Sequence, residues 1–173
     1  MILIGLGANL PTEAFGPPRA GLQAALDLLD RDEVRPLARS RWFRSAPWPE
    51  SDQPWFVNGV ARLETPLAPE ALLDRMLAIE RRFGRRRGRL NAARVLDLDL
   101  LDYHGRIVAG DEGAGGTVLT LPHPRMHERA FVLVPLAEVA PGWRHPLTGQ
   151  GLDELIDALS TGQKIEALDA GPP

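Results

Sequence analysis

The hydrophobic and polar positions of this chain follow two different periods, which predict a mixture of strands and helices. Apolar runs and every-second-residue alternation are typical of strands, whereas apolar positions three and four residues apart are typical of helices. We therefore expect strands at residues 1–7, 34–44, 56–65, 95–103 and 118–121, a helix from residue 17, and further helices at 69–83, 132–139 and 152–159.

The order of these elements predicts the fold class. The chain reads strand, helix, strand, strand, helix, strand up to residue 103, and a hairpin and helical additions follow. That order is typical of an α+β fold of ferredoxin-like type, in which an antiparallel sheet has helices packed on one face. We expect the other face to be open for a ligand.

Two aspartates share one face of the strand expected at 95–103. Asp97 and Asp99 are two residues apart, and the leucines beside them point to the opposite face. Carboxylates about 6.5–7 Å apart along a strand can hold hard cations between them. An edge strand with a solvated face carries the same pattern, and for an isolated Asp-x-Asp that is the commoner explanation.

An arginine-rich segment immediately before this strand favours the metal interpretation. Residues 81–94 contain seven arginines and no acid, although the chain as a whole has a net charge of −3. Guanidinium groups and divalent cations are the two usual ways to neutralise phosphoryl oxygens. A short basic segment on an acidic chain favours a small anionic ligand over a long nucleic-acid track. The pattern indicates a polyphosphate site, although most of the seven arginines can equally be solvated surface residues.

Aromatic and polar residues elsewhere provide further candidates. The loop at 44–55 contains prolines and two tryptophans, and such rigid aromatic loops either cover ligands or pack half-buried. In the strand that follows, Phe56 and Asn58 share a face and can present a ring and an amide to one ligand. His123, Arg129 and Phe131 form a second group before the helix at 132–139.

Length and composition limit the class of protein. The 173 residues, 44% of them hydrophobic, suffice for one domain with a core, which we place at 1–162, with a frayed tail at 163–173. The absence of cysteine excludes disulfides, thiol catalysis and zinc–thiolate sites. The apolar start is typical of neither a signal peptide nor a membrane span. We expect a cytoplasmic monomer that binds small molecules and neither nucleic acid nor membrane.

Several motifs, taken in their order along the chain, resemble one family. The chain is similar to the 6-hydroxymethyl-7,8-dihydropterin pyrophosphokinases (HPPK) of folate biosynthesis. The matching segments are Gly7-Ala8-Asn9-Leu10, Asp52-Gln53-Pro54-Trp55-Phe56-Val57-Asn58, Arg94-Val95-Leu96-Asp97-Leu98-Asp99, Pro122-His123, Arg129-Ala130-Phe131 and Pro135-Leu136-Ala137-Glu138-Val139-Ala140-Pro141. The resemblance implies transfer of pyrophosphate from the co-substrate ATP to the hydroxymethyl oxygen of the pterin, with release of AMP.

The resemblance also assigns roles to individual residues. It implies two Mg²⁺ ions held by Asp97 and Asp99, and these aspartates act in catalysis with Arg85 and Arg94. The residues implied to bind ATP are Arg85, Arg87, Arg94, Leu100, Thr120, His123 and Arg129, with Leu100 contributing its backbone. Those implied to bind the pterin are Ser45, Ala46, Trp48, Phe56, Asn58 and Phe131.

The chain departs from the family pattern in three places, one of which is Phe56, where the family often has tyrosine. The family's usual Trp-Gly-Pro-Arg before the aspartate strand is replaced by Asn91-Ala92-Ala93-Arg94, so loop closure over ATP is expected to differ. Ala46 stands where proline is common. Two alternatives remain: a non-enzymatic ferredoxin-like module that binds nucleic acid, and a family member without turnover. The aspartate pair argues against the first, because it would repel a phosphate backbone without a metal.

Overall fold

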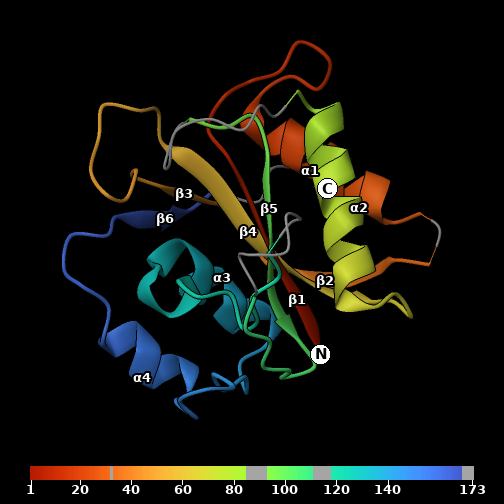
Figure 1. The fold of residues 1–173 in the computed structure, drawn as a ribbon. Coiled ribbons are helices and arrows are strands. Elements are labelled where there is room, and N and C mark those ends of the chain that lie inside the picture. Colours follow the sequence, from red (N-terminus) through yellow and green to blue (C-terminus); the bar gives the residue numbers. More distant parts are fainter. Residues whose placement is uncertain (32, 85–92, 111–117, 169–173) are drawn as a thin grey trace.

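The computed structural model describes residues 1–31, 33–84, 93–110 and 118–168 (Figure 1). Its elements are β1 (Ile2–Ala8), α1 (Pro18–Leu29), β2 (Arg35–Arg39), β3 (Phe43–Ser45), β4 (Phe56–Glu64), α2 (Pro69–Arg82), β5 (Asp97–Tyr103), the 3₁₀ turn η2 (Met126–Glu128), α3 (Ala130–Val139), α4 (Leu152–Asp157) and β6 (Ile165–Ala167). Both α1 and α2 begin with proline, which lacks the N–H that a first helical turn leaves unpaired.

The strands form one antiparallel sheet, which confirms the predicted fold class. Its order is β5-β1-β4-β3-β6, and β2 also pairs with β4. The strand expected at 34–44 is divided into β2 and β3, and between them the Ser40 side chain bonds to β4, with its Oγ accepting from Val60 N–H at 3.0 Å. The prediction of a strand at 118–121 is wrong. In this part of the described chain only Leu121 forms a β-bridge, and its partner is Val108.

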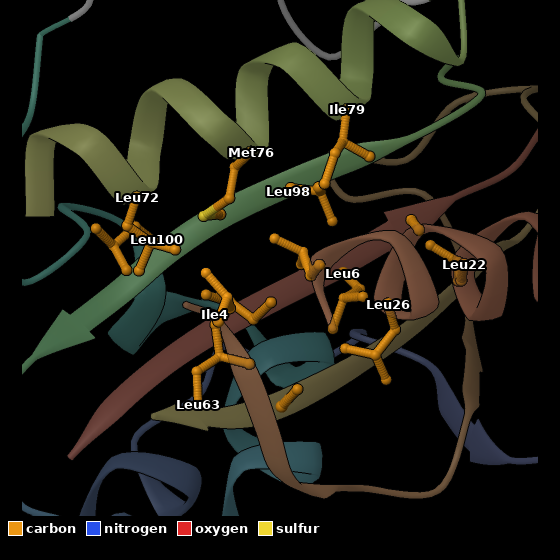
Figure 2. Close-up of a cluster of buried hydrophobic side chains, with 14 of the residues drawn as sticks. Ile4, Leu6, Leu22, Leu26, Leu63, Leu72, Met76, Ile79, Leu98 and Leu100 are labelled. Carbon is orange, nitrogen blue, oxygen red and sulfur yellow. The ribbon is translucent and has the colours of Figure 1, made fainter. Parts of the chain in front are cut away.

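The first face of the sheet carries an apolar core beneath α1 and α2. Leu72, Met76 and Ile79 of α2 point onto Leu98 and Leu100 of β5 (Figure 2). Beside them, residues of α1 meet β1 and β4, including Leu22 and Leu26 against Leu6. The predicted placement of the leucines is confirmed, since Leu98 and Leu100 of β5, and Leu96 just before it, are all buried in this cluster.

The second face is not open throughout, contrary to our expectation. Leu3, Val60 and Leu101 point away from the first core and form a second cluster with residues of α3 and α4. Figure 1 shows these two helices on the side of the sheet opposite α1 and α2. A bulge between Leu3 and Ile4 shifts the β1–β5 register there. A ligand can therefore use only the part of this face that α3 and α4 leave uncovered.

The segment 163–168, which we predicted to belong to a frayed tail, contains the strand β6. β6 pairs with β3, with Ser45 opposite Ile165 and Phe43 opposite Ala167. Two further backbone bonds flank this pairing: Ala46 N–H donates to Lys164 C=O at 3.1 Å, and Leu168 N–H to Trp42 C=O at 2.8 Å. Residues 169–173 lie outside the described part. None of the helices described here is long and apolar enough to cross a membrane.

Candidate active site

A pocket opens on the uncovered part of the second face, between the loop after β3 and the start of α3. Its lining includes all six residues predicted to bind a pterin: Ser45, Ala46, Trp48, Phe56, Asn58 and Phe131. The same pocket is also lined by Arg94, Asp97 and Arg129, which we predicted to bind phosphate or metal ions. These three residues therefore lie next to the six predicted pterin-binding residues. Sequence reasoning missed the remaining lining residues: Gly7, Pro47, Pro49 and Gln53.

The neutral part of the pocket combines rings with a fixed amide. Asn58 is 5% exposed, and its Nδ2 donates to Ser45 Oγ at 2.9 Å, which fixes the orientation of the amide. Phe56 and Phe131 line the pocket from β4 and α3. Such a combination suits a flat heterocycle, because rings stack on its faces while an amide reads its hydrogen-bonding edge.

Two glycines of β1 lie opposite the aspartates of β5, and one of them, Gly7, lines the pocket. In the β1–β5 register Asp97 lies opposite Gly7 and Asp99 opposite Gly5. A Cβ on Gly7 would come within 3.0 Å of Asn58 Oδ1. The lack of a side chain at Gly7 therefore leaves room for the Asn58 amide, whereas at Gly5 the Leu101 side chain covers the strand, with Cδ2 3.5 Å from the position of a Cβ.

The two aspartates lie among cationic and imidazole groups. Asp97 forms an ion pair with Arg94 Nη1. Asp99 Oδ2 is 3.9 Å from Arg129 Nη1 and 3.9 Å from His123 Nε2. The side chains of Asp97 and Asp99 are 17% and 32% exposed, so they stay accessible to a ligand from solvent. The site thus brings together residues from β5, the turn before η2, and the start of α3.

The position of Arg94 is set by Asn9, which sequence reasoning did not place in the site. Asn9 Oδ1 accepts from Arg94 N–H at 2.7 Å, and Arg94 C=O accepts from Asn9 N–H at 2.9 Å. Asn9 Nδ2 donates to Pro54 C=O at 3.0 Å. This side chain, 3% exposed, therefore joins the loop before β4 to the segment before β5. The Gly-Ala-Asn motif was the available signal, but it gave no role.

Burial lowers the pKa values of His123 and Arg129. Desolvation, with the nearby charge of Arg129 second, lowers the pKa of His123 to about 4, so this imidazole is neutral at pH 7. Its Nδ1 accepts from Arg125 N–H at 3.3 Å. This bond assigns the tautomer in which Nδ1 is unprotonated and Nε2 carries the proton. Nε2 is therefore a hydrogen-bond donor on the side of Asp99. Burial also lowers the pKa of Arg129, which still remains charged at neutral pH.

Other predicted residues lie away from the pocket. The side chain of Leu100 is buried in the core of the first face, so only its backbone is available. Thr120 is half-buried next to Gly110 and does not line the pocket. Arg85 and Arg87 lie outside the described residues. The remaining predicted residues do come together around Asp97, Asp99 and the pocket.

The residues available for a cation are the two aspartates of β5. Within the described ranges no group of three or more His, Asp or Glu side chains is arranged to hold a metal ion. Magnesium, however, is commonly held by one or two carboxylates, with water and substrate phosphates completing its six oxygen ligands. Two accessible carboxylates on one strand face, with arginines beside them, fit that donor set.

Comparisons with known proteins agree with this geometry. Residues 3–141 match the family described as 7,8-dihydro-6-hydroxymethylpterin-pyrophosphokinase (HPPK). The 2-amino-4-hydroxy-6-hydroxymethyldihydropteridine pyrophosphokinase of Pseudomonas aeruginosa is 44% identical over 158 residues, covering 91% of this chain and 90% of the relative. The protein of the same name from Methylorubrum extorquens is 42% identical over 139 residues, covering 80% and 81% of the two chains.

A solved structure supports the fold independently of close sequence similarity. A crystal structure of an HPPK-DHPS in complex with substrates matches with a TM-score of 0.66 at 11% identity, over 91% of this chain. The chain spans only 43% of that longer polypeptide, and at this identity the match concerns the fold alone. Together with the match over residues 3–141 and the relatives above 40% identity, these findings establish that the chain belongs to the HPPK family.

Proposed function

We propose that this protein transfers the pyrophosphoryl group of ATP to the hydroxymethyl oxygen of 6-hydroxymethyl-7,8-dihydropterin. The main observation in support of the proposal is that one site combines a neutral half and a charged half. A neutral half, with Phe56, Phe131 and the fixed Asn58 amide, adjoins a charged half that begins at Arg94, Asp97 and Arg129. The first suits a flat heterocycle, and the second suits a polyphosphate.

The reaction requires little covalent participation by the protein. The alcohol oxygen forms a bond to the β-phosphorus of ATP while the bond from that phosphorus to the α,β-bridging oxygen breaks, so AMP leaves and the alcohol proton is released. Rate enhancement then comes mainly from alignment of the two substrates and from neutralisation of phosphoryl charge. The two adjoining halves of the site are suited to hold the two substrates side by side.

The charged residues divide between cation binding and phosphate binding. We propose that Asp97 and Asp99 hold two Mg²⁺ ions, which when bound would polarise the phosphoryl oxygens and offset their charge. In our proposal Arg94 and Arg129 contact the phosphates directly, and the neutral His123 donates a hydrogen bond to them. Binding of a cation at Asp97 would compete with the Arg94–Asp97 ion pair, so Arg94 would become available to phosphate when the cation binds.

The remaining assignments rest on family membership and composition. We propose that Arg85 and Arg87 also contact ATP, and that Thr120 and the backbone of Leu100 lie near the adenine. On the pterin side we propose that Ser45, Ala46 and Trp48 close the pocket around the substrate. We further propose a cytoplasmic monomer that uses no nucleic acid, in keeping with the cysteine-free sequence and its small-molecule pocket.

The function is tested by release of AMP from ATP. The purified protein is incubated with ATP and Mg²⁺, with or without the hydroxymethyl-dihydropterin, and a parallel reaction contains EDTA. We expect AMP only when both pterin and Mg²⁺ are present. A matched reaction with a pterin that lacks the hydroxymethyl group should give none. Absence of AMP from the complete reaction, despite binding of both substrates, would contradict turnover and indicate an inactive relative.

A further inference from the structure

The start of α3 positions two residues of the site, but the side chain at its N-cap position does not cap the helix. Arg129 occupies the N-cap position in an extended conformation, and its side chain makes no capping hydrogen bond. The first N–H groups of a helix have no partner within the helix and need one from elsewhere. Arg129 and Phe131, on either side of Ala130, both line the pocket. The partner of this helix end therefore influences the geometry of the site.

Gln163 supplies the missing partner from the C-terminal segment. Its Oε1 accepts from Ala130 N–H at 2.8 Å, and its Nε2 donates to Glu128 C=O at 2.9 Å. One side-chain amide thus bonds the backbone immediately before and immediately after Arg129. A third bond, from Nε2 to Ser160 Oγ at 3.2 Å, holds the amide from its own side.

The same segment also holds the opposite wall of the pocket. Directly after Gln163, Lys164 C=O accepts from Ala46 N–H, and β6 pairs with β3 at Ser45. Ser45 and Ala46 line the pocket across from the start of α3. Hydrogen bonds of residues 163–165 therefore connect the start of α3 with the pocket wall formed by Ser45 and Ala46.

We infer that Gln163 is a positioning residue that sets the placement of Arg129 at the site for phosphoryl transfer. The inference rests on the proposed function, because Arg129 matters for turnover only if phosphate binds beside Asp99. The guanidinium of Arg129 is 3.9 Å from Asp99 Oδ2 and lies over the Phe131 ring, 5.5 Å from its centroid. A charge so placed acts through its geometry, and a shift of about 1 Å can lower a rate by about a hundredfold. A backbone fixed on both sides of the residue resists such a shift.

A double-mutant cycle tests this inference. Gln163→Met retains the length of the side chain and removes its amide, and we expect kcat to fall by about tenfold. In an Arg129→Ala background the same substitution should change kcat by less than about twofold, since there is no guanidinium left to position. Gln163→Glu retains the acceptor for Ala130 N–H and loses the donor, so we expect an intermediate kcat. Lys164→Ala, which keeps the backbone carbonyl bonded to Ala46, should retain the wild-type value.

A second readout is independent of turnover. Exchange of the Ala130 amide hydrogen, followed by NMR, should be faster in Gln163→Met than in wild type and unchanged in Lys164→Ala. Equal losses of kcat in both backgrounds, or unchanged exchange at Ala130, would overturn the positioning role while leaving the proposed function intact. A wild-type protein that forms no AMP would instead overturn the proposed function, and the inference about Gln163 with it.

Discussion

The two faces of the sheet are built from the same strands but differ in what they bury. The first face buries an apolar cluster beneath α1 and α2, together with the carboxylate of Glu80 on α2, whose Oε1 accepts from the N–H of Leu98 at 2.7 Å. The second face buries an apolar cluster beneath α3 and α4, and beside it polar residues such as Asn58 and Ser45. Because alternate residues of one strand serve both faces, stability and chemistry can be changed separately.

Removal of an aspartate from the second face should have the largest effect. Asp99→Ala is expected to lower the rate of AMP formation by about a thousandfold or more, because a cation ligand and its charge are lost. The free energy of unfolding should change by less than about 1 kcal/mol, since this side chain is partly exposed. Rates come from AMP assays and stability from urea unfolding. Asp74→Ala, an exposed aspartate on α2, is the control and should leave both quantities unchanged. Retention of more than a tenth of the activity in Asp99→Ala would be incompatible with its proposed role.

Truncation of the first core should give the opposite pattern. Met76 is fully buried in α2, and Met76→Ala is expected to lower the free energy of unfolding by about 2–5 kcal/mol. The kcat per folded molecule should remain within about twofold of wild type, because Met76 belongs to the apolar cluster of the first face and does not line the pocket. Urea unfolding and AMP assays at 15 °C measure the two quantities. As a control, Leu37→Ala removes an exposed leucine of β2 and should cost less than about 0.5 kcal/mol. A large fall in kcat of folded Met76→Ala protein would show that the faces are coupled.

Loss of a pocket ring should affect one substrate and spare the other. Phe131→Ala is expected to weaken binding of the pterin by about 1–3 kcal/mol, the range for loss of an aromatic ring stacked on a base. Binding of a non-hydrolysable ATP analogue with Mg²⁺ should change by less than about threefold. Titration calorimetry measures both affinities, and Phe131→Tyr, which keeps the ring, is the control. Equal weakening of both ligands would indicate that the two halves of the site are not distinct.

The smallest predicted effect concerns a buried polar group beneath the second face. His145 is 3% exposed, and burial, with the nearby charge of His127 second, lowers its pKa below 6.5. Asp102 partly offsets this shift, and its Oδ2 accepts from Trp143 Nε1 at 2.6 Å. A lowered pKa means that the unfolded chain binds this proton more readily. Stability from this group is therefore complete above pH 6.5 and declines as the pH falls below it.

The change in stability with pH can be assigned to His145 by substitution. The urea midpoint of the wild-type protein should fall between pH 7 and pH 5, and that of His145→Gln should fall less steeply. Comparison of the slopes, rather than the absolute midpoints, removes any constant cost of replacing a buried ring. Identical slopes in the two proteins would assign the pH dependence to other groups.

The sequence predicted the first face better than the second. Helical spacing of apolar residues in α2, and the alternation of Asp97, Leu98, Asp99 and Leu100 in β5, report directly which side chains a core buries, so α2 and β5 were placed to within a few residues. The second face depends on contacts between distant segments. Nothing in the local pattern of 163–168 indicates that this segment pairs with β3 and bonds the start of α3.

The candidate site shows the same division. Asp97 and Asp99 were found because two carboxylates on one strand face are a local pattern, and the pocket residues were found through family motifs. Asn9 and Gln163 were missed because their roles are hydrogen bonds to the backbone of remote residues, Arg94 and Ala130. Such hydrogen bonds depend on tertiary geometry. The residue type of an asparagine or glutamine does not indicate which backbone group its side chain will bond.

The central claim is that this site moves two phosphoryl groups together from ATP to an alcohol. The most direct test is phosphorus NMR of the reaction with ATP, Mg²⁺ and 6-hydroxymethyl-7,8-dihydropterin. The account predicts AMP and a pterin ester that carries two coupled phosphorus nuclei, formed at equal rates and in equal amounts. Formation of ADP with a pterin monophosphate, or release of inorganic pyrophosphate without any pterin ester, would contradict it.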